Sequence, residues 1–142
     1  MSHQTFAHLH RVTYAECTIG NHVYYSRYLD LLETARGEFF RALGMTFQQW
    51  HEHDTVFPVI EANLRYKAAA RYDDVLTIEI WLTELERVRM GFSHRICNEK
   101  QKLLVEASTL HVCASANDKL KRLPEDLVKK LRPYLAPPAG AT

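Results

Sequence analysis

Several side chains capable of polar chemistry fall within nine residues near the start of the chain. This segment holds a thiol, a hydroxyl, an amide, an imidazole and a phenol, on Cys17, Thr18, Asn21, His22 and Tyr25. His22 is the only one whose ordinary pKa lies near neutrality, so it could accept a proton or orient a water molecule. The alternative for His22 is an exposed turn residue without a role. Thr18 cannot act as a base, but its hydroxyl can hydrogen-bond a water molecule or a carbonyl group.

Cys17 raises the further possibility of a thiolate nucleophile. One residue away from Thr18, it would point to the opposite face of a strand, and no histidine is fixed beside it by the sequence, which favours buried packing instead. Elsewhere, His94 and His111 lie within predicted strands, and His51 and His53 are spaced too closely to share one face of a helix. No third ligand can be placed beside any of them, so no metal site is predicted.

The polar segment lies where a predicted strand gives way to a long helix. The strand is expected over His8 to Glu16 and the turn over Ile19 to Asn21. From Ser26 to Leu43 apolar residues recur at three- and four-residue steps, and Gly44 follows as a stop signal. A helix that begins near Tyr24 to Ser26 would present free N–H groups and its positive dipole end to a ligand oxygen beside the polar segment.

The remainder of the chain predicts strands joined by short loops. Alternating apolar residues indicate strands over 60–66 and 76–82, and two further strands are expected over 89–98 and 103–116 with a hairpin loop at 99–102. A short helix is expected from Leu123 to about Tyr134, and 136–142 is expected to be a flexible tail. The predicted class is α+β, with a five-stranded antiparallel sheet around one long helix. The unpaired sheet edges favour a homodimer or homotetramer.

The composition indicates one globular domain over residues 1–142. The chain is 46% hydrophobic and 25% charged, and 18 Lys and Arg residues balance 17 Asp and Glu residues. The basic residues are scattered, so no nucleic-acid surface is expected, and no apolar stretch is long enough to span a membrane. The three cysteines, which are widely spaced, predict reduced thiols. These features, and the lack of a signal peptide in the first residues, predict a cytoplasmic protein.

This order of elements, together with local motifs, resembles the 4-hydroxybenzoyl-CoA thioesterase family of hotdog-fold acyl-CoA thioesterases. The motif residues at the turn and helix are Tyr14, Glu16, Val23, Tyr25, Tyr28 and the run Glu33 to Arg36. Similar tracts lie at Arg65 to Glu79, at Leu103 to Ala114 and at Arg122 to Pro124. The resemblance implies a hotdog fold, hydrolysis of an acyl-CoA to the free acid and CoA, and no cofactor. It also implies that the backbone at Tyr25 polarises the thioester carbonyl.

The chain departs from the family pattern at the turn. Thr18 stands where the family carries the aspartate that acts as nucleophile or general base, and Asn21 stands where glycine is usual. The base is therefore expected to be His22 or Glu33, with Thr18 in a hydrogen-bonding role. Glu33 has an equally plausible alternative as an ion-pair partner, and its candidate partners are Arg36 and Arg65.

The residues expected to contact the substrate are Asn21, Val23, Tyr24 and Leu32, and Leu32 is expected to line a tunnel for the acyl chain between the sheet and the helix. Two other functions stay open at this point. Loss of the aspartate is compatible with a non-catalytic acyl-CoA-binding protein, and the hotdog fold is compatible with an acyl-ACP hydrolase or dehydratase.

Overall fold

The computed structural model describes residues 3–138. In chain order the elements are β1 (Phe6–Arg11), the 3-10 turn η1 (Tyr14–Glu16), β2 (Cys17–Thr18), β3 (His22–Val23), α1 (Arg27–Ala42), α2 (Phe47–Glu52), β4 (Val59–Tyr66), β5 (Val75–Leu85), β6 (Arg89–Cys97), β7 (Leu103–Val112), α3 (Glu125–Leu131) and η2 (Arg132–Tyr134). Five strands form one antiparallel sheet in the order β1-β5-β6-β7-β4, and β2 and β3 form a separate hairpin. The expected α+β architecture is confirmed.

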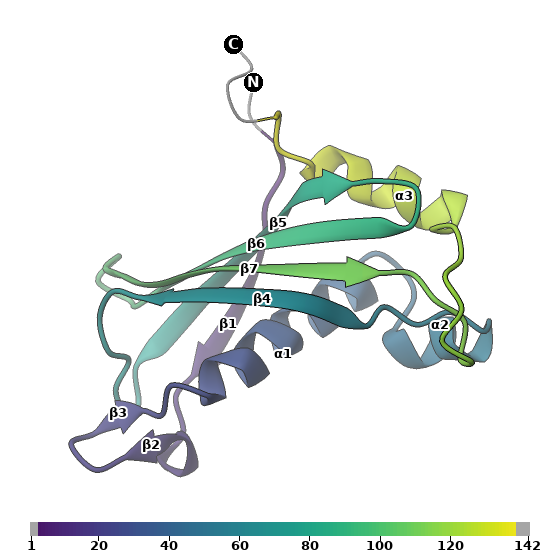
Figure 1. Ribbon diagram of the computed structural model, residues 1–142. Coiled ribbons are helices and arrows are strands. Elements are labelled where there is room, and N and C mark those ends of the chain that lie inside the picture. Colours follow the sequence, from purple (N-terminus) through teal and green to yellow (C-terminus); the bar gives the residue numbers. More distant parts are fainter. Residues whose placement is uncertain (1–2, 139–142) are drawn as a thin grey trace.

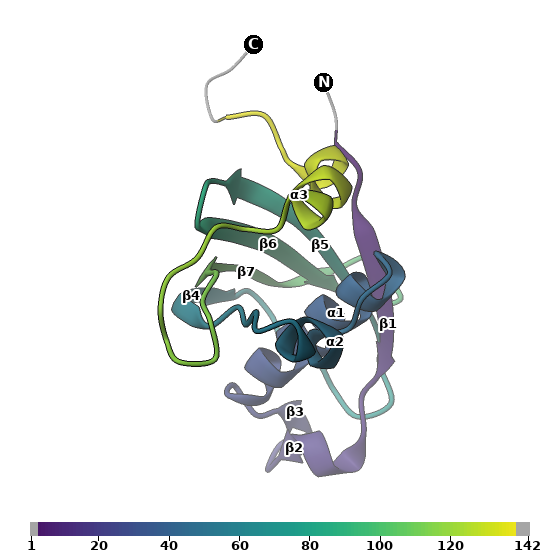
Figure 2. The same ribbon diagram turned by 90° about the vertical axis from the view of Figure 1, so that its right-hand side faces the viewer.

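The long helix α1 lies across one face of the sheet, which curves around it (Figure 1 and Figure 2). Its buried face carries the apolar residues that the periodicity predicted, together with one charged residue: Tyr28, Leu31, Leu32, Ala35, Arg36, Phe39 and Phe40. The helix ends before Gly44, whose φ of 113° favours a residue without a side chain. Two apolar clusters fill the space between α1 and the sheet, one along each half of the helix.

The start of the chain differs from the expected strand. β1 ends at Arg11, and the backbone turns through η1 before the hairpin begins. The Glu16 carboxylate causes this turn, because it accepts a hydrogen bond from the Thr13 amide at 2.7 Å and so caps the 3-10 helix. Glu16 therefore does not lie on a strand face with Thr18. A second difference is that β7 ends at Val112 rather than at Ala116.

The C-terminal segment packs beside the turn between β5 and β6, with α3 lying over it (Figure 1). At Ala136, the first residue of the predicted tail, the backbone amide donates to the Leu82 carbonyl at 2.8 Å. Residues 139–142 of that predicted tail lie outside the described part of the chain. Between residues 3 and 138, no helix is long and apolar enough to cross a membrane.

The sheet order leaves β1 and β4 at the two edges. Most of β4 is solvent-exposed, and it presents three large apolar side chains to solvent, those of Val59, Ile60 and Tyr66. An exposed apolar edge strand is a ready template for pairing with another strand.

Candidate active site

The hairpin β2–β3 brings the predicted polar residues to the N-terminal end of α1 (Figure 1). Thr18 lies directly opposite His22 in the antiparallel pair. The connection is a tight turn in which the Asn21 amide donates to the Thr18 carbonyl at 3.1 Å. Gly20 and Asn21 adopt φ values of 89° and 62°, which glycine and asparagine tolerate better than other residues. The turn thus forms with asparagine at the position where the family pattern has glycine.

Asn21 anchors the hairpin to the rest of the fold, a role that was not predicted. Its side-chain oxygen accepts a hydrogen bond from the Tyr72 amide at 3.0 Å, and its carbonyl oxygen lies 3.4 Å from an Arg71 guanidinium nitrogen. These bonds fasten the hairpin to the loop that precedes β5. Because the amide oxygen already has a donor, the geometry favours an anchoring role over the predicted contact with substrate.

The hairpin is joined directly to the start of α1. The Val23 amide donates to the Ala70 carbonyl at 2.9 Å, and the Tyr24 amide donates to the Glu16 carbonyl at 3.0 Å. The Val23 side chain is buried in the core. The backbone amides of both residues and the Val23 side chain therefore hold the fold together. Of these two predicted substrate contacts, only the Tyr24 side chain is exposed.

Two backbone amides at this junction stay free. Neither the Tyr25 nor the Ser26 N–H finds an acceptor between residues 3 and 138, and the Ser26 side chain does not cap the helix. Both amides stand at the positive end of the α1 dipole. Free amides at such a position can stabilise an oxygen atom that gains negative charge during a reaction. This is the arrangement expected for polarisation of a thioester carbonyl at Tyr25.

Tyr66, at the end of β4, supports this junction. Its hydroxyl donates to the Tyr25 carbonyl oxygen at 3.1 Å, and its ring packs against the rings of Tyr25 and Tyr28. The bond fixes the peptide that links Tyr25 to Ser26, whose N–H is one of the two free amides. From the sequence, Tyr66 was expected only as one residue of an alternating strand. Pairing across 41 positions gives no local signal, so this role could not be predicted.

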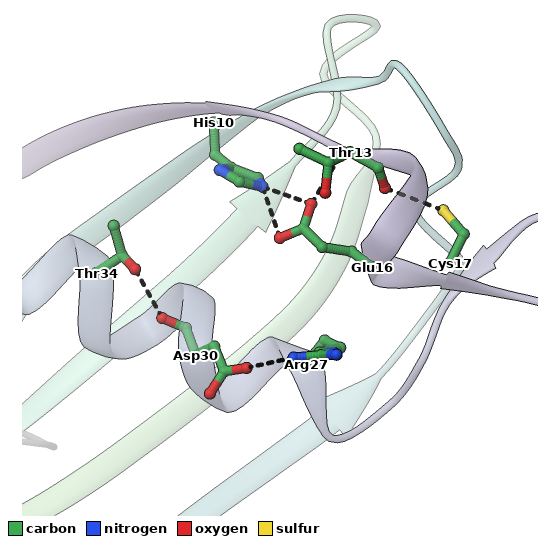
Figure 3. Close-up of polar contacts among 7 residues, drawn as sticks. All are labelled: His10, Thr13, Glu16, Cys17, Arg27, Asp30 and Thr34. Carbon is green, nitrogen blue, oxygen red and sulfur yellow. Dashed lines mark hydrogen bonds and ion pairs between the residues drawn. The ribbon is translucent and has the colours of Figure 1, made fainter.

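The side chains of Glu16 and Cys17 make their polar contacts with His10 and Thr13 rather than at the free amides. Figure 3 shows Glu16 turned back toward His10 and Thr13, with His10 Nε2 at 2.9 and 3.0 Å from its two oxygens. Burial acts to raise the pKa of Glu16, but the hydrogen bonds from Thr13 and His10 hold it below its ordinary value. Burial, with the nearby charges of Glu16 and Asp74, raises the pKa of the Cys17 thiol.

The half-buried Cys17 packs against the core, and its Sγ lies 3.6 Å from the Thr13 carbonyl oxygen (Figure 3). A protonated thiol in this position is a poor nucleophile, which agrees with the predicted packing role. The same view shows Arg27 and Asp30 paired at 3.5 Å in the first turn of α1, where both side chains are exposed.

Glu33 and Leu32 lie away from the hairpin. Glu33 is six residues beyond Arg27, or about 9 Å along the helix axis, and its exposed side chain lines a cavity of about 280 Å³. Neither of the ion pairs considered for it, with Arg36 or with Arg65, forms in the described part of the chain. Leu32 is fully buried between α1 and the sheet, so it is a core residue rather than part of a tunnel wall.

The structure therefore divides the predicted residues into two groups. Thr18, His22 and the Tyr25 backbone lie together at the hairpin and helix junction, where the Thr18 and His22 side chains are exposed. Glu33 lies at the mouth of a separate cavity farther along α1. Within one chain, His22 is the candidate base that shares the junction with the free amides.

The comparisons agree with this architecture. Residues 20–105 match the model of the thioesterase superfamily. The acyl-CoA thioester hydrolase YbgC of Escherichia coli is 34% identical over 121 residues, which cover 85% of this chain and 88% of the relative.

Two solved structures are also similar. A hypothetical protein from Aquifex aeolicus has a TM-score of 0.85 and 28% identity, with coverage of 89% of this chain and 98% of that one. A 1,4-dihydroxy-2-naphthoyl-CoA thioesterase from Synechocystis has a TM-score of 0.85 and 23% identity, with coverage of 91% and 96%, and shows the shared fold. The match to the family model spans β3, α1, α2 and the strands β4, β5 and β6, which is more than half of the chain, so this chain belongs to the thioesterase superfamily.

Proposed function

We propose that this protein hydrolyses acyl-CoA thioesters to the free acid and CoA. The observation that carries the proposal is the pair of free amides, of Tyr25 and Ser26, at the positive end of α1. The name of its E. coli relative, acyl-CoA thioester hydrolase, supports the same reaction. In this reaction the amides bind the thioester oxygen as it gains negative charge, and water supplies the oxygen atom of the new acid.

We further propose that the chain is a 4-hydroxybenzoyl-CoA thioesterase-like enzyme in which Thr18 replaces the family aspartate. A hydroxyl cannot accept the proton from water at neutral pH, so Thr18 orients the water and another group removes its proton. His22 lies opposite Thr18 on the hairpin and is the base that one chain can supply. Glu33 is the alternative if a second chain contributes to the site.

The exposed edge of β4 supports a homodimer that brings these parts together. Antiparallel pairing of two β4 strands about a two-fold axis would join the sheets and would place the start of one β4 beside the end of the other. Val59, at the start, lines the Glu33 cavity, whereas Tyr66, at the end, is bonded to Tyr25. Such pairing would set the cavity of one subunit against the free amides of its partner, and two dimers could associate further into a tetramer.

We also place this enzyme in the cytoplasm. All three cysteines are free thiols in the structure, as expected in a reducing compartment.

The activity is tested by the thiol released from a panel of acyl-CoA esters of differing chain length and aromatic character. Calorimetric titration with the same esters provides the parallel measurement of binding. The proposal predicts saturable thiol release for at least one ester, and its absence across the panel would refute hydrolysis. Acyl-ACP or hydroxyacyl-ACP substrates, offered in the same assay, separate the ACP hydrolase and dehydratase alternatives.

Thr18 itself favours one other function, a non-catalytic acyl-CoA-binding protein, because the usual carboxylate is missing from the junction. That function predicts calorimetric binding of an acyl-CoA without thiol release. The two candidates are therefore separated by the same pair of measurements.

A further inference from the structure

The buried face of α1 carries a charged residue that has no partner. Arg36 is 7% exposed, and its guanidinium finds neither a hydrogen-bond acceptor nor a carboxylate within ion-pair distance among residues 3–138. Burial lowers its pKa and the nearby charge of Glu33 opposes this effect, but arginine keeps its proton under ordinary conditions. A buried, unpaired charge is costly to a fold, so a ligand that supplies the opposite charge would be bound favourably.

The guanidinium faces the cavity of about 280 Å³ that Glu33 also lines. Its other walls are largely apolar and aromatic: Phe40, Phe47, Phe57, Phe92 and Met90. Ligand sites commonly combine such walls with a few placed polar groups. The volume lies near the lower end of the usual range of roughly 300–1,000 Å³, which suits a single ring better than a long chain.

The neighbouring histidines leave Arg36 as the cation that a ligand would meet in this cavity. His111 uses both ring nitrogens internally: Nδ1 donates to the Phe57 carbonyl at 3.0 Å, so Nε2 is the acceptor for the Thr109 hydroxyl, also at 3.0 Å. Burial, followed by the charge of Arg36, lowers the pKa of His94 to about 3. Burial also lowers the pKa of His111, to about 4, despite its bond to Phe57. Both rings are therefore uncharged at neutral pH.

Glu33 is the acidic residue of the lining, and it does not neutralise Arg36. Its side chain is exposed to solvent at the mouth, where water screens its charge, and the two residues form no ion pair. The donors of Arg36 are thus available at the inner wall. A carboxylate suits them best, because two parallel N–H groups of a guanidinium match its two oxygens and its charge offsets the buried one.

We infer that this cavity receives the distal end of the acyl group and that Arg36 binds a carboxylate there, so that the favoured substrates are CoA monothioesters of aromatic dicarboxylic acids. The inference rests on the proposed thioesterase function. Along α1, Arg36 lies nine residues beyond Arg27, or about 13.5 Å along the helix axis, so the cavity of a subunit is well separated from its own free amides. In the proposed dimer, the thioester would lie at the amides of one subunit and the ring in the cavity of its partner.

The test compares 4-carboxybenzoyl-CoA with 4-methylbenzoyl-CoA, which differ in charge but little in size. The wild-type protein should show the higher kcat/KM for the carboxy ester, by about tenfold or more, as expected for a charge-assisted bidentate pair. Arg36→Met should abolish this preference. Arg36→Lys keeps the charge but loses the two parallel N–H groups, so it should retain part of the preference. Arg41→Met is the matched control, because Arg41 lies on the same helix with an exposed side chain.

The folded state of each variant is checked by thermal unfolding without ligand. If Arg36 serves a ligand, Arg36→Met should unfold at the same or a higher temperature than wild type, because a buried unpaired charge has been removed. A lower unfolding temperature, with an unchanged substrate preference, would show that Arg36 is structural and would overturn the inference. Equal wild-type kcat/KM values for the two esters would also overturn it.

A separate measurement keeps this inference distinct from the proposed function. Benzene-1,4-dicarboxylate and its uncharged analogue benzene-1,4-dicarboxamide are titrated into the wild type, Arg36→Met and Arg41→Met by calorimetry. Tighter binding of the dicarboxylate, lost only in Arg36→Met, would establish the site even if no ester were hydrolysed. Equal binding of the two compounds, or binding of neither, would refute the site even if thioesterase activity were found.

Discussion

In the proposed assignment, Thr18 stands where related enzymes carry an aspartate. It lies opposite His22 on the hairpin that leads into α1. Thr18→Asp would place a carboxylate there. Because a positioned base contributes roughly 10²- to 10⁴-fold, we expect this variant to raise kcat at least tenfold in the thiol-release assay. Thr18→Asn is the control of similar shape without charge, and a gain of the same size in this variant would argue against base catalysis.

Tyr66 acts on the site through the Tyr25 peptide. Tyr66→Phe removes the 3.1 Å hydrogen bond to the Tyr25 carbonyl while keeping the ring contacts. A hydrogen bond of this kind is worth about 1 kcal/mol, so kcat should fall about fivefold with little change in KM. Tyr72→Phe is the matched control, because the Tyr72 ring also packs on a neighbouring tyrosine but its hydroxyl makes no bond within residues 3–138. An equal loss of kcat in both variants would show that the Tyr66 hydrogen bond does not support the site.

The identity of the base is decided by two further substitutions. Since loss of a general base costs roughly 10²- to 10⁴-fold, we expect His22→Ala or Glu33→Gln to lower kcat by this factor. Full activity in both single variants would exclude both residues as the base.

At the scale of elements, the exposed β4 edge should control assembly. Ile60→Lys places a charge near the start of the exposed β4 edge, so we expect a monomer by light scattering at micromolar concentration and a large loss of activity. Leu9→Lys is the matched control, because Leu9 is also an exposed apolar residue and lies on β1, the opposite edge of the sheet. A wild-type protein that is itself monomeric would contradict the proposed dimer, and so would a dimer that survives Ile60→Lys.

The elements were predictable to the extent that their patterns are local. The alternation of Leu76, Ile78, Ile80 and Leu82 predicted the buried face of β5, and the three- and four-residue steps predicted α1. The turn at Tyr14–Glu16 was missed, because the residue types in this segment are those of a strand. The backbone bends there only because the Glu16 side chain caps the turn. Arg36 was missed as a buried residue, because a charged residue type in a helical pattern gives no sign of burial. Glu33 was correctly placed on α1, but only the fold shows that it belongs to a different cavity.

At the scale of the whole molecule, the buried histidines should make the fold sensitive to mild acid. Burial, with the charge of Arg36, lowers the pKa of His94 to about 3, and burial lowers that of His111 to about 4, from 6.5. Below pH 6.5 these two histidines therefore bind protons in the unfolded chain but stay unprotonated in the folded state. Stability is complete above that pH and falls, by up to roughly 1.4 kcal/mol per pH unit for each histidine, as the pH drops toward 4.

Denaturant unfolding at pH 7.5, 6 and 5 measures this effect. His94→Leu should weaken the pH dependence without a large loss of stability at pH 7.5, because neither ring nitrogen of His94 has a hydrogen-bond partner of good geometry among the described residues. His51→Gln, which changes an exposed histidine, should leave the pH dependence as in wild type. Stability that is constant between pH 7.5 and 5 would contradict the buried, uncharged state of these rings.

Rapid quench and intact-protein mass spectrometry of the first turnover test whether water attacks the thioester directly. A hydrolysed acyl-CoA from the panel is mixed with excess wild-type protein, and released CoA and protein mass are measured on the same samples. Direct attack by water, with the carbonyl held at the Tyr25 and Ser26 amides, predicts CoA release with no acylated protein at any time. A transient acyl adduct, mapped to Cys17 and absent in Cys17→Ala, would contradict the account, and so would bound ester without CoA release.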